Sequence, residues 1–296
     1  MTGPTPRFGR VLTAMVTPFD EQGDLDLDAA ATLAAWLVDN GSDGLVIAGT
    51  TVESPVLSDS EEVALTKAVR AAVSVPLLLG TGSNDTAYAV DATRRAAQLG
   101  VEGVLVVSPY YNRPSQAGLD QYFRSVAAAT DLPVVIYDIP VRTGRKVSTD
   151  TLLGLAHDVD NVVALKDAAG DPAETATFLR DAPTGFEVYS GDDALTLPLL
   201  AVGAVGAISV ASHWIGRQIG EMIAAFAAGD VGRAAHINGT LVESYAYETG
   251  DAAPNPIPTK CMLRVLGLNV GSCRSPLGPE PDWLEAQART VLDRLV

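Results

Sequence analysis

The sequence predicts an α/β protein that folds as a (β/α)8 TIM barrel with a C-terminal helical extension. Eight short apolar runs alternate with alanine-rich helical segments over roughly the first 225 residues, which is the pattern of repeated β/α units. After that point the alternation stops and the remaining segments have helical character. The chain has 296 residues, 47% of them hydrophobic, so it can bury one large core and an appendage. We therefore expect a catalytic barrel at residues 1–225 and a helical domain at residues 226–296.

The eight expected strands are short, apolar and rich in β-branched residues, as parallel strands buried on both faces usually are. They lie at residues 11–19, 44–48, 75–80, 103–108, 133–138, 162–167, 186–190 and 204–210. A doubly wound open sheet is the alternative, and it would need a glycine-rich phosphate loop. The nearest candidate, residues 80–85, lacks the third glycine, so the barrel is favoured.

The helices between these strands carry recognisable start and stop signals. They are expected at residues 28–39, 58–73, 85–99, 119–130 and 172–180 within the barrel, and at 217–228, 231–247, 258–266 and 282–295 after it. Ser58 followed by Glu61 forms a capping box. Gly41 and Gly100 follow helical segments directly and are typical C-terminal cap residues.

Charge and cysteine content exclude several classes of partner. The formal net charge of −16 argues against binding to nucleic acid or to an anionic membrane. An anionic substrate would therefore have to be attracted by a local group of arginines. Two cysteines, Cys261 and Cys273, fit neither a disulfide framework nor a zinc site, and no apolar run is long enough for a membrane span. We expect a cytoplasmic protein that does not bind a membrane.

One expected strand carries a lysine into an apolar run. Residues 162–165 are apolar, and Lys166 follows them at the C-terminal end of the strand. The other three lysines are expected in polar or loop-like settings: Lys67, Lys146 and Lys260. Long cations are seldom buried without a reason. Two interpretations are open: Lys166 reaches solvent or pairs with Asp167, or it is a desolvated, partly neutral amine that forms a Schiff base with a carbonyl.

In a barrel of this type the chemistry lies where the strands end, so the other strand ends test the second interpretation. Thr50 and Thr51 follow the second strand and could hold a carboxylate, although they could equally form an ordinary polar turn. Tyr111 follows the fourth strand in a proline-flanked loop, and a phenol can transfer protons or simply pack. Tyr137 ends the fifth strand, and Arg142 follows it with a guanidinium that could bind a carboxylate.

These segments together resemble the Schiff-base class I aldolase superfamily that includes the dihydrodipicolinate synthase and N-acetylneuraminate lyase families. The matching stretches extend over nearly the whole chain, from residues 13–19 to residues 255–260. Residues 109–115 and the Tyr-x-x-Pro-x-Arg-Thr-Gly stretch at residues 137–144 are similar to the synthase branch in particular.

The resemblance implies a role for each of these side chains. Lys166 would form an imine with pyruvate, and Tyr137 would shuttle protons to and from it. Thr50 and Thr51 would hold the pyruvate carboxylate and form a hydroxyl relay with the two tyrosines. Tyr111 would come from a neighbouring subunit.

Arg142 would bind the carboxylate of the second substrate, L-aspartate 4-semialdehyde, and the backbone carbonyl of Ile208 would line the pocket. The resemblance implies no metal and no cofactor, and it implies a homodimer or homotetramer. Another pyruvate-dependent aldolase or dehydratase that acts on a keto sugar acid stays open, as does a catalytically silent paralogue.

Three features depart from the usual pattern. Val52 stands where the family usually has glycine, which would be costly if the position requires a positive φ. Asp138 replaces an asparagine, and we expect Arg142, Arg145 or backbone amides to hold it. Tyr88 falls where lysine-inhibited relatives have a glutamate, so we predict weak or absent inhibition by L-lysine; the alternative is that Asp59 or Glu62 supplies the carboxylate instead.

Overall fold

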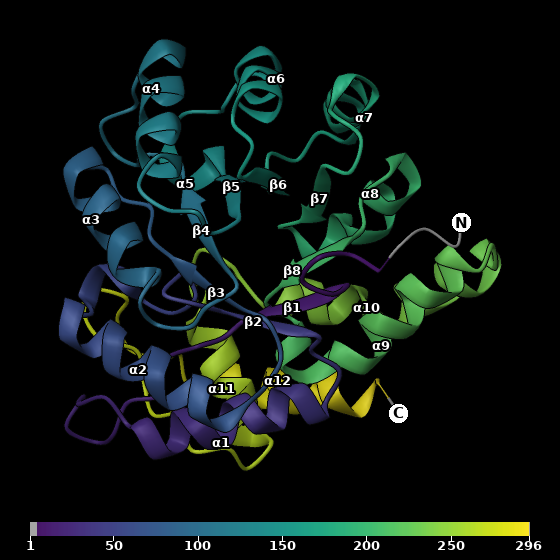
Figure 1. Cartoon of the computed structure of the whole chain (residues 1–296). Helices are drawn as coiled ribbons and strands as arrows, with labels where there is room; N and C mark the ends of the chain where they lie inside the picture. Colours follow the sequence, from purple (N-terminus) through teal and green to yellow (C-terminus); the bar gives the residue numbers. More distant parts are fainter. Residues whose placement is uncertain (1–4, 296) are drawn as a thin grey trace. The chain divides into compact units, whose positions relative to one another are not determined.

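The computed structural model describes residues 5–295, and its eight strands form a closed parallel barrel in the order β1 to β8 (Figure 1). The barrel confirms the predicted fold class, and the open-sheet alternative is wrong. Each strand lies within a predicted run: β1 Val11–Ala14, β2 Gly44–Ile47, β3 Leu77–Gly80, β4 Gly103–Val107, β5 Val134–Asp138, β6 Val162–Asp167, β7 Glu187–Ser190 and β8 Gly206–Ser209. Each strand is followed by at least one helix.

The chain divides into two compact units. One comprises Val11–Val75 and the chain from Ser209 onward, and the other comprises Pro6–Arg10 and Pro76–Ile208. The expected domain boundary at residue 225 falls near the end of helix α9 (Ser212–Ala227) and stays a prediction. Between residues 5 and 295, no helix combines the length and the apolar character that crossing a bilayer requires.

The unit built on Pro76–Ile208 contains strands β3 to β8. Neighbouring strands pair in parallel, for example Val106 with Ile136 and Leu165 with Val188, and their apolar side chains are almost completely buried. The helices of this unit form an outer layer beside the strands (Figure 1). They are α3 Thr86–Ala96, α4 Gln116–Ala127, α5 Pro140–Thr143, α6 Thr149–Asp158, α7 Pro172–Asp181 and α8 Thr196–Val202, with a 3₁₀ turn at Asp193–Leu195.

The other unit contains β1, β2 and the C-terminal helices. Its helices are α1 Leu27–Asp39, α2 Asp59–Ala72, α9 Ser212–Ala227, α10 Val231–Tyr247, α11 Ile257–Val265 and α12 Leu284–Asp293, with a 3₁₀ turn at Ser54–Val56. The capping box at the start of α2 is present as predicted. The Ser58 side chain accepts a hydrogen bond from the Glu61 backbone N–H, and the Glu61 carboxylate accepts one from the Ser58 backbone N–H. Gly41 follows the C-cap Asn40 of α1 and has a positive φ, as expected of a helix C-terminal glycine. The prediction for Gly100 is wrong: α3 already ends at Ala96 with Ala97 as its C-cap, so Gly100 lies beyond the cap although its φ is positive.

Several predicted boundaries are wrong. Helix α3 ends at Ala96 rather than at residue 99, and α4 begins at Gln116 rather than at residue 119. The two largest differences have a local reason. Strand β1 ends at Ala14 rather than at residue 19. The Val16 N–H donates to His213 Nε2 (3.1 Å) instead of to a strand, Pro18 has no N–H, and Phe19 forms an antiparallel bridge with Leu25. Helix α9 begins at Ser212 rather than at residue 217. Its first turn is separated from the rest by non-helical backbone at Ile215, so only the later part follows the helical pattern.

Candidate active site

The centre of the candidate site is a lysine beside a tyrosine on two paired strands. Tyr137 of β5 lies opposite Lys166 of β6 in the parallel register, so both side chains leave the sheet on the same face. Lys166 Nζ lies 4.2 Å from the centroid of the Tyr137 ring, and the two side chains are only 4% and 5% exposed. A cation over the face of a phenol ring is attracted by the ring quadrupole.

The burial of Lys166 tests the first of the two interpretations of this residue. A side chain that is 4% exposed does not reach solvent. Asp167 points to the opposite face of β6, where its carboxylate accepts hydrogen bonds from Thr175 Oγ1 (2.5 Å) and the Ala169 N–H (2.9 Å). The solvent-reaching interpretation is therefore wrong, and the structure places a buried amine at the end of the strand.

Gly191, immediately after β7, was not identified from the sequence as part of the site. Its N–H donates to the Asp167 carbonyl (2.7 Å), which holds its backbone against β6. A Cβ at this position would lie 2.9 Å from Lys166 Cγ and 3.0 Å from Lys166 Cε. Glycine is thus the residue that leaves room for the lysine stem, and a local pattern of residue types cannot reveal such a spatial requirement.

Two other predicted site residues of this unit differ sharply in exposure. Ile208 of β8 is 1% exposed. Tyr111 is 90% exposed and has a φ of 72°, which is uncommon for an aromatic residue. The Arg113 Nε donates to the Gly144 carbonyl (2.8 Å) and ties the Tyr111 loop to the segment after β5. Within one chain, the structure does not bring Tyr111 into the buried Tyr137–Lys166 pair.

Arg142 lies on α5, four residues after Asp138, and is exposed. The carboxylate of Asp138 is held by the Val147 N–H (3.2 Å) and lies 3.5 Å from Lys146 Nζ. The expectation of a backbone amide is therefore confirmed, but the cation is Lys146 rather than Arg142 or Arg145. Burial raises the pKa of Asp138 to about 6, and the nearby Lys146 ammonium opposes that shift.

Thr50 and Thr51 lie in the other compact unit, in the turn after β2. Thr50 is half-buried, and Thr51 is 3% exposed with its hydroxyl accepting a hydrogen bond from Asn255 Nδ2 (2.9 Å). Val52 is not among the residues with positive φ, whereas Glu53 has a φ of 61°. The strain expected at Val52 is therefore absent, because the left-handed conformation falls on the next residue.

The prediction that Lys260 occupies a polar or loop-like setting is wrong. Lys260 is 1% exposed on α11, and its Nζ lies 2.7 Å from Glu53 Oε1 and donates to the Ser272 carbonyl (2.9 Å). Burial lowers the pKa of Lys260, and the Glu53 carboxylate opposes that shift. The unit that holds Thr51 therefore has a buried lysine of its own, and this lysine is paired with a carboxylate.

Comparison with known proteins agrees with this arrangement. A family model described as the dihydrodipicolinate synthetase family matches residues 7–294. The chain is 50% identical to the 4-hydroxy-tetrahydrodipicolinate synthase of Moorella thermoacetica over 92% of each chain.

Solved structures give the same result. A dihydrodipicolinate synthase from Bacillus anthracis superposes with a TM-score of 0.93 at 43% identity, covering 98% of this chain and 99% of that one. The lysine-bound enzyme from Cyanidioschyzon merolae superposes with a TM-score of 0.95 at 43% identity and the same coverage. The fold, the strand-end lysine and these similarities together show that the chain belongs to the dihydrodipicolinate synthetase family.

Proposed function

We propose that this chain is a Schiff-base lyase of the class I aldolase type that condenses pyruvate with L-aspartate 4-semialdehyde to give 4-hydroxy-tetrahydrodipicolinate. This reaction would supply diaminopimelate and lysine biosynthesis. The observation that carries the proposal is the buried Lys166 amine, with its Nζ 4.2 Å from the Tyr137 ring centroid. The similarity to 4-hydroxy-tetrahydrodipicolinate synthases of 46–50% identity over more than nine-tenths of the chain supports the same substrates.

The chemistry begins with attack of Lys166 Nζ on the keto carbon of pyruvate. The carbinolamine loses water to form an imine, whose nitrogen acts as an electron sink when the methyl group loses a proton. The resulting enamine carbon forms a bond to the aldehyde carbon of the semialdehyde. The amino group of the bound semialdehyde then attacks the imine carbon and displaces Lys166, which closes the ring and regenerates the free amine.

Proton transfer during these steps is assigned to hydroxyl groups. Tyr137 would donate a proton when water leaves the carbinolamine, and its burial beside Lys166 supports that role. Thr50 and Thr51 would hold the pyruvate carboxylate and pass protons between Tyr137 and Tyr111. The Thr51 hydroxyl accepts a hydrogen bond from Asn255, so its own proton is free to be directed at a substrate oxygen or a neighbouring hydroxyl.

Arg142 would bind the carboxylate of the semialdehyde, and the Ile208 carbonyl would line the pocket. Removing a charge-assisted contact of this kind typically costs about 1.5–3 kcal/mol. We therefore expect Arg142→Ala to lower kcat/KM for the semialdehyde by roughly tenfold or more while pyruvate still reacts with Lys166. An equal loss in both measurements would make the arginine structural.

A homodimer or homotetramer would complete the site. In one isolated chain Tyr111 is 90% exposed on a loop with a positive φ, which supports its burial against a second copy. The reaction would take place in the cytoplasm, and the free thiols of Cys261 and Cys273 suit a reducing compartment.

Borohydride trapping tests the mechanism directly. The protein is incubated with pyruvate, reduced, digested and mapped by mass spectrometry, and we expect the mass of reduced pyruvate on Lys166 only. Lys260 is the internal control, because it is a second buried lysine and its Nζ lies 2.7 Å from Glu53 Oε1. Label on Lys260 or Lys146 would overturn the mechanism. Turnover of keto sugar acids instead of the semialdehyde by a correctly labelled enzyme would overturn the substrate assignment.

A further inference from the structure

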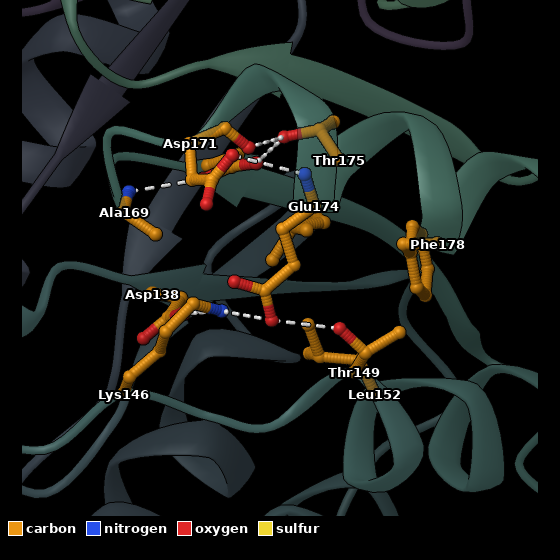
Figure 2. A pocket seen from close by; sticks show the side chains of 11 residues that line it. Asp138, Lys146, Thr149, Leu152, Ala169, Asp171, Glu174, Thr175 and Phe178 are labelled. Atoms are coloured by element: carbon orange, nitrogen blue, oxygen red, sulfur yellow. Dashed lines mark hydrogen bonds and ion pairs between the residues drawn. The ribbon is translucent and has the colours of Figure 1, made fainter.

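A charged cluster lies behind the Tyr137–Lys166 pair, on the opposite face of the same two strands. Asp138 pairs with Asp167 in the register one position after Tyr137 and Lys166, and successive side chains of a strand point to opposite faces. Both carboxylates are buried, with exposures of 1% and 7%. They line a small cavity, with side chains of α6 and α7 on its other side (Figure 2).

Lys146 connects Asp138 to helix α7. Its Nζ lies 3.5 Å from Asp138 Oδ2 and 3.1 Å from Glu174 Oε1, and it donates to the Val147 carbonyl (3.1 Å). The same Glu174 oxygen accepts a hydrogen bond from Thr149 Oγ1 (2.7 Å). Figure 2 shows the Lys146 nitrogen between the two carboxylates. We call Asp138, Lys146 and Glu174 the loop clamp.

The loop clamp closes the segment that carries Arg142. The Asp138 carboxylate accepts the Val147 N–H (3.2 Å) and faces Lys146, so the two ends of residues 138–147 are joined through one side chain. Helix α5, with Arg142 in its last turn, lies between those ends. Arg142 itself is exposed, so its position depends on how its loop is held rather than on burial of its own side chain.

Asp138 is the member of the loop clamp whose charge responds to pH. Its Oδ2 makes no hydrogen bond, and burial raises its pKa to about 6. The charged groups around it are Lys146 before α6, Asp167 on β6, and Asp171 and Glu174 at the start of α7. Lys146 and the Val147 N–H favour the ionised form of Asp138, and the negative charge of Asp167 disfavours it.

Resting on the proposed function, we infer that Asp138 is a positioning residue for the second substrate. Its ionised form holds Lys146 and thereby fixes the loop that presents Arg142 to the semialdehyde carboxylate. Protonation of Asp138 removes the attraction for Lys146 and loosens that loop. Use of the semialdehyde therefore declines at mildly acidic pH, while formation of the pyruvate imine at Lys166 on the other face of the strands continues.

The test compares the wild type with Asp138→Asn between pH 5.5 and 8, at saturating pyruvate and varied semialdehyde. Asparagine has nearly the same shape and can still accept the Val147 N–H, but it carries no charge. For the wild type we expect kcat/KM for the semialdehyde to fall roughly fivefold to tenfold as the pH drops through about 6, because an ionic contact is lost. The Asn variant should show the lower value throughout and a flat profile over this range.

Lys146→Met removes the other partner of the same contact. Without the ammonium, ionised Asp138 has nothing to hold, so kcat/KM for the semialdehyde should be low and its pH profile flat, as for Asp138→Asn. A residue that merely supports folding would lower activity equally at every pH. Asp150→Asn, an exposed carboxylate in the first turn of α6, is the matched control and should behave as the wild type.

Borohydride trapping of pyruvate at Lys166, measured on the same samples, separates this inference from the proposed function. Trapping rates of wild type and Asp138→Asn should agree within about twofold at each pH. Failure of the wild type to trap pyruvate would overturn the proposed function itself. Normal trapping with identical semialdehyde profiles for both proteins would overturn the loop clamp. A parallel loss of trapping and semialdehyde use would show that Asp138 acts on Lys166 instead.

Discussion

Adding one methyl group beside the lysine tests how tightly the site is packed. The Cβ of an alanine at position 191 would lie 2.9 Å from Lys166 Cγ, 3.0 Å from Lys166 Cε and 3.0 Å from Ala168 Cβ. These distances are several tenths of an ångström below ordinary carbon contacts of about 3.5–4.0 Å. Gly191 is not among the glycines with positive φ, so space rather than backbone conformation opposes the change.

The lysine stem has to move, because the Gly191 backbone is held by its hydrogen bond to the Asp167 carbonyl. Overpacking of a core typically costs about 1–3 kcal/mol of unfolding free energy. A displacement of about 1 Å at a reacting group can cost about a hundredfold in rate. For Gly191→Ala we therefore expect pyruvate trapping at Lys166 to slow by between about tenfold and a hundredfold, with a folded protein.

The assay is the rate of borohydride-trapped adduct at saturating pyruvate, alongside a thermal unfolding curve. Gly154→Ala in helix α6 is the matched control, since the nearest atom to its new Cβ is Arg124 Nη2 at 3.9 Å. It should trap pyruvate at the wild-type rate, because alanine suits a helix interior. A Gly191→Ala variant that traps pyruvate as fast as the wild type would refute the reasoning that Gly191 confines the lysine.

Three further predictions follow from the same structure. The pKa of Asp138 is raised from 3.8 to about 6 in the folded protein. Between these two values the folded protein binds a proton that the unfolded chain has lost, so the unfolding free energy decreases as the pH rises toward 6 and stays lower above it. Between pH 5 and pH 8 the loss of unfolding free energy amounts to about 1.4 kcal/mol. Urea unfolding at matched protein concentration should show no such loss for Asp138→Asn. An equal pH dependence in both proteins would count against the raised pKa. Lys260→Ala removes the cation beside the buried Glu53 carboxylate and should lower the unfolding free energy by about 3–5 kcal/mol. Lys67→Ala on the surface of α2 should change it by under about 0.5 kcal/mol. Similar values for the two variants would contradict the importance of the buried pair. Sub-millimolar L-lysine should leave the steady-state rate unchanged. Tyr88 supplies no carboxylate for the amino group of lysine, and the Arg95 guanidinium lies 5.7 Å from the centroid of the Tyr88 ring. Half-inhibition by sub-millimolar L-lysine would show this prediction wrong.

The barrel and the buried lysine could be predicted because their signals are local. Each strand is a short apolar run, and Lys166 lies at the end of one, so its burial follows from the strand itself. The position of Tyr137 opposite Lys166 follows from pairing of two strands that end in the same direction. Residues 15–19 were less predictable, because an apolar run alone does not show where a ladder stops.

The remaining features depend on contacts between distant segments. Lys260 follows a helical pattern that says nothing of Glu53, and Asn255 lies in a proline-rich break that gives no sign of Thr51. Lys146 lies in a polar loop as expected, but its place between two carboxylates from different elements could not be predicted. Such pairings have no period in the sequence, and they appear only when the fold places the segments together.

The buried pair of Glu53 and Lys260 also sets an order of events during synthesis. The two residues are 207 positions apart (260 − 53), and a ribosome adding about 5–20 residues per second needs roughly 10–40 s to cover that length. Throughout that interval the turn after β2 has no buried partner for its carboxylate, whereas strands β3 to β8 emerge consecutively with their neighbours. The turn that holds Thr51 is thus among the first parts of the site to be synthesised and among the last to reach its folded contacts.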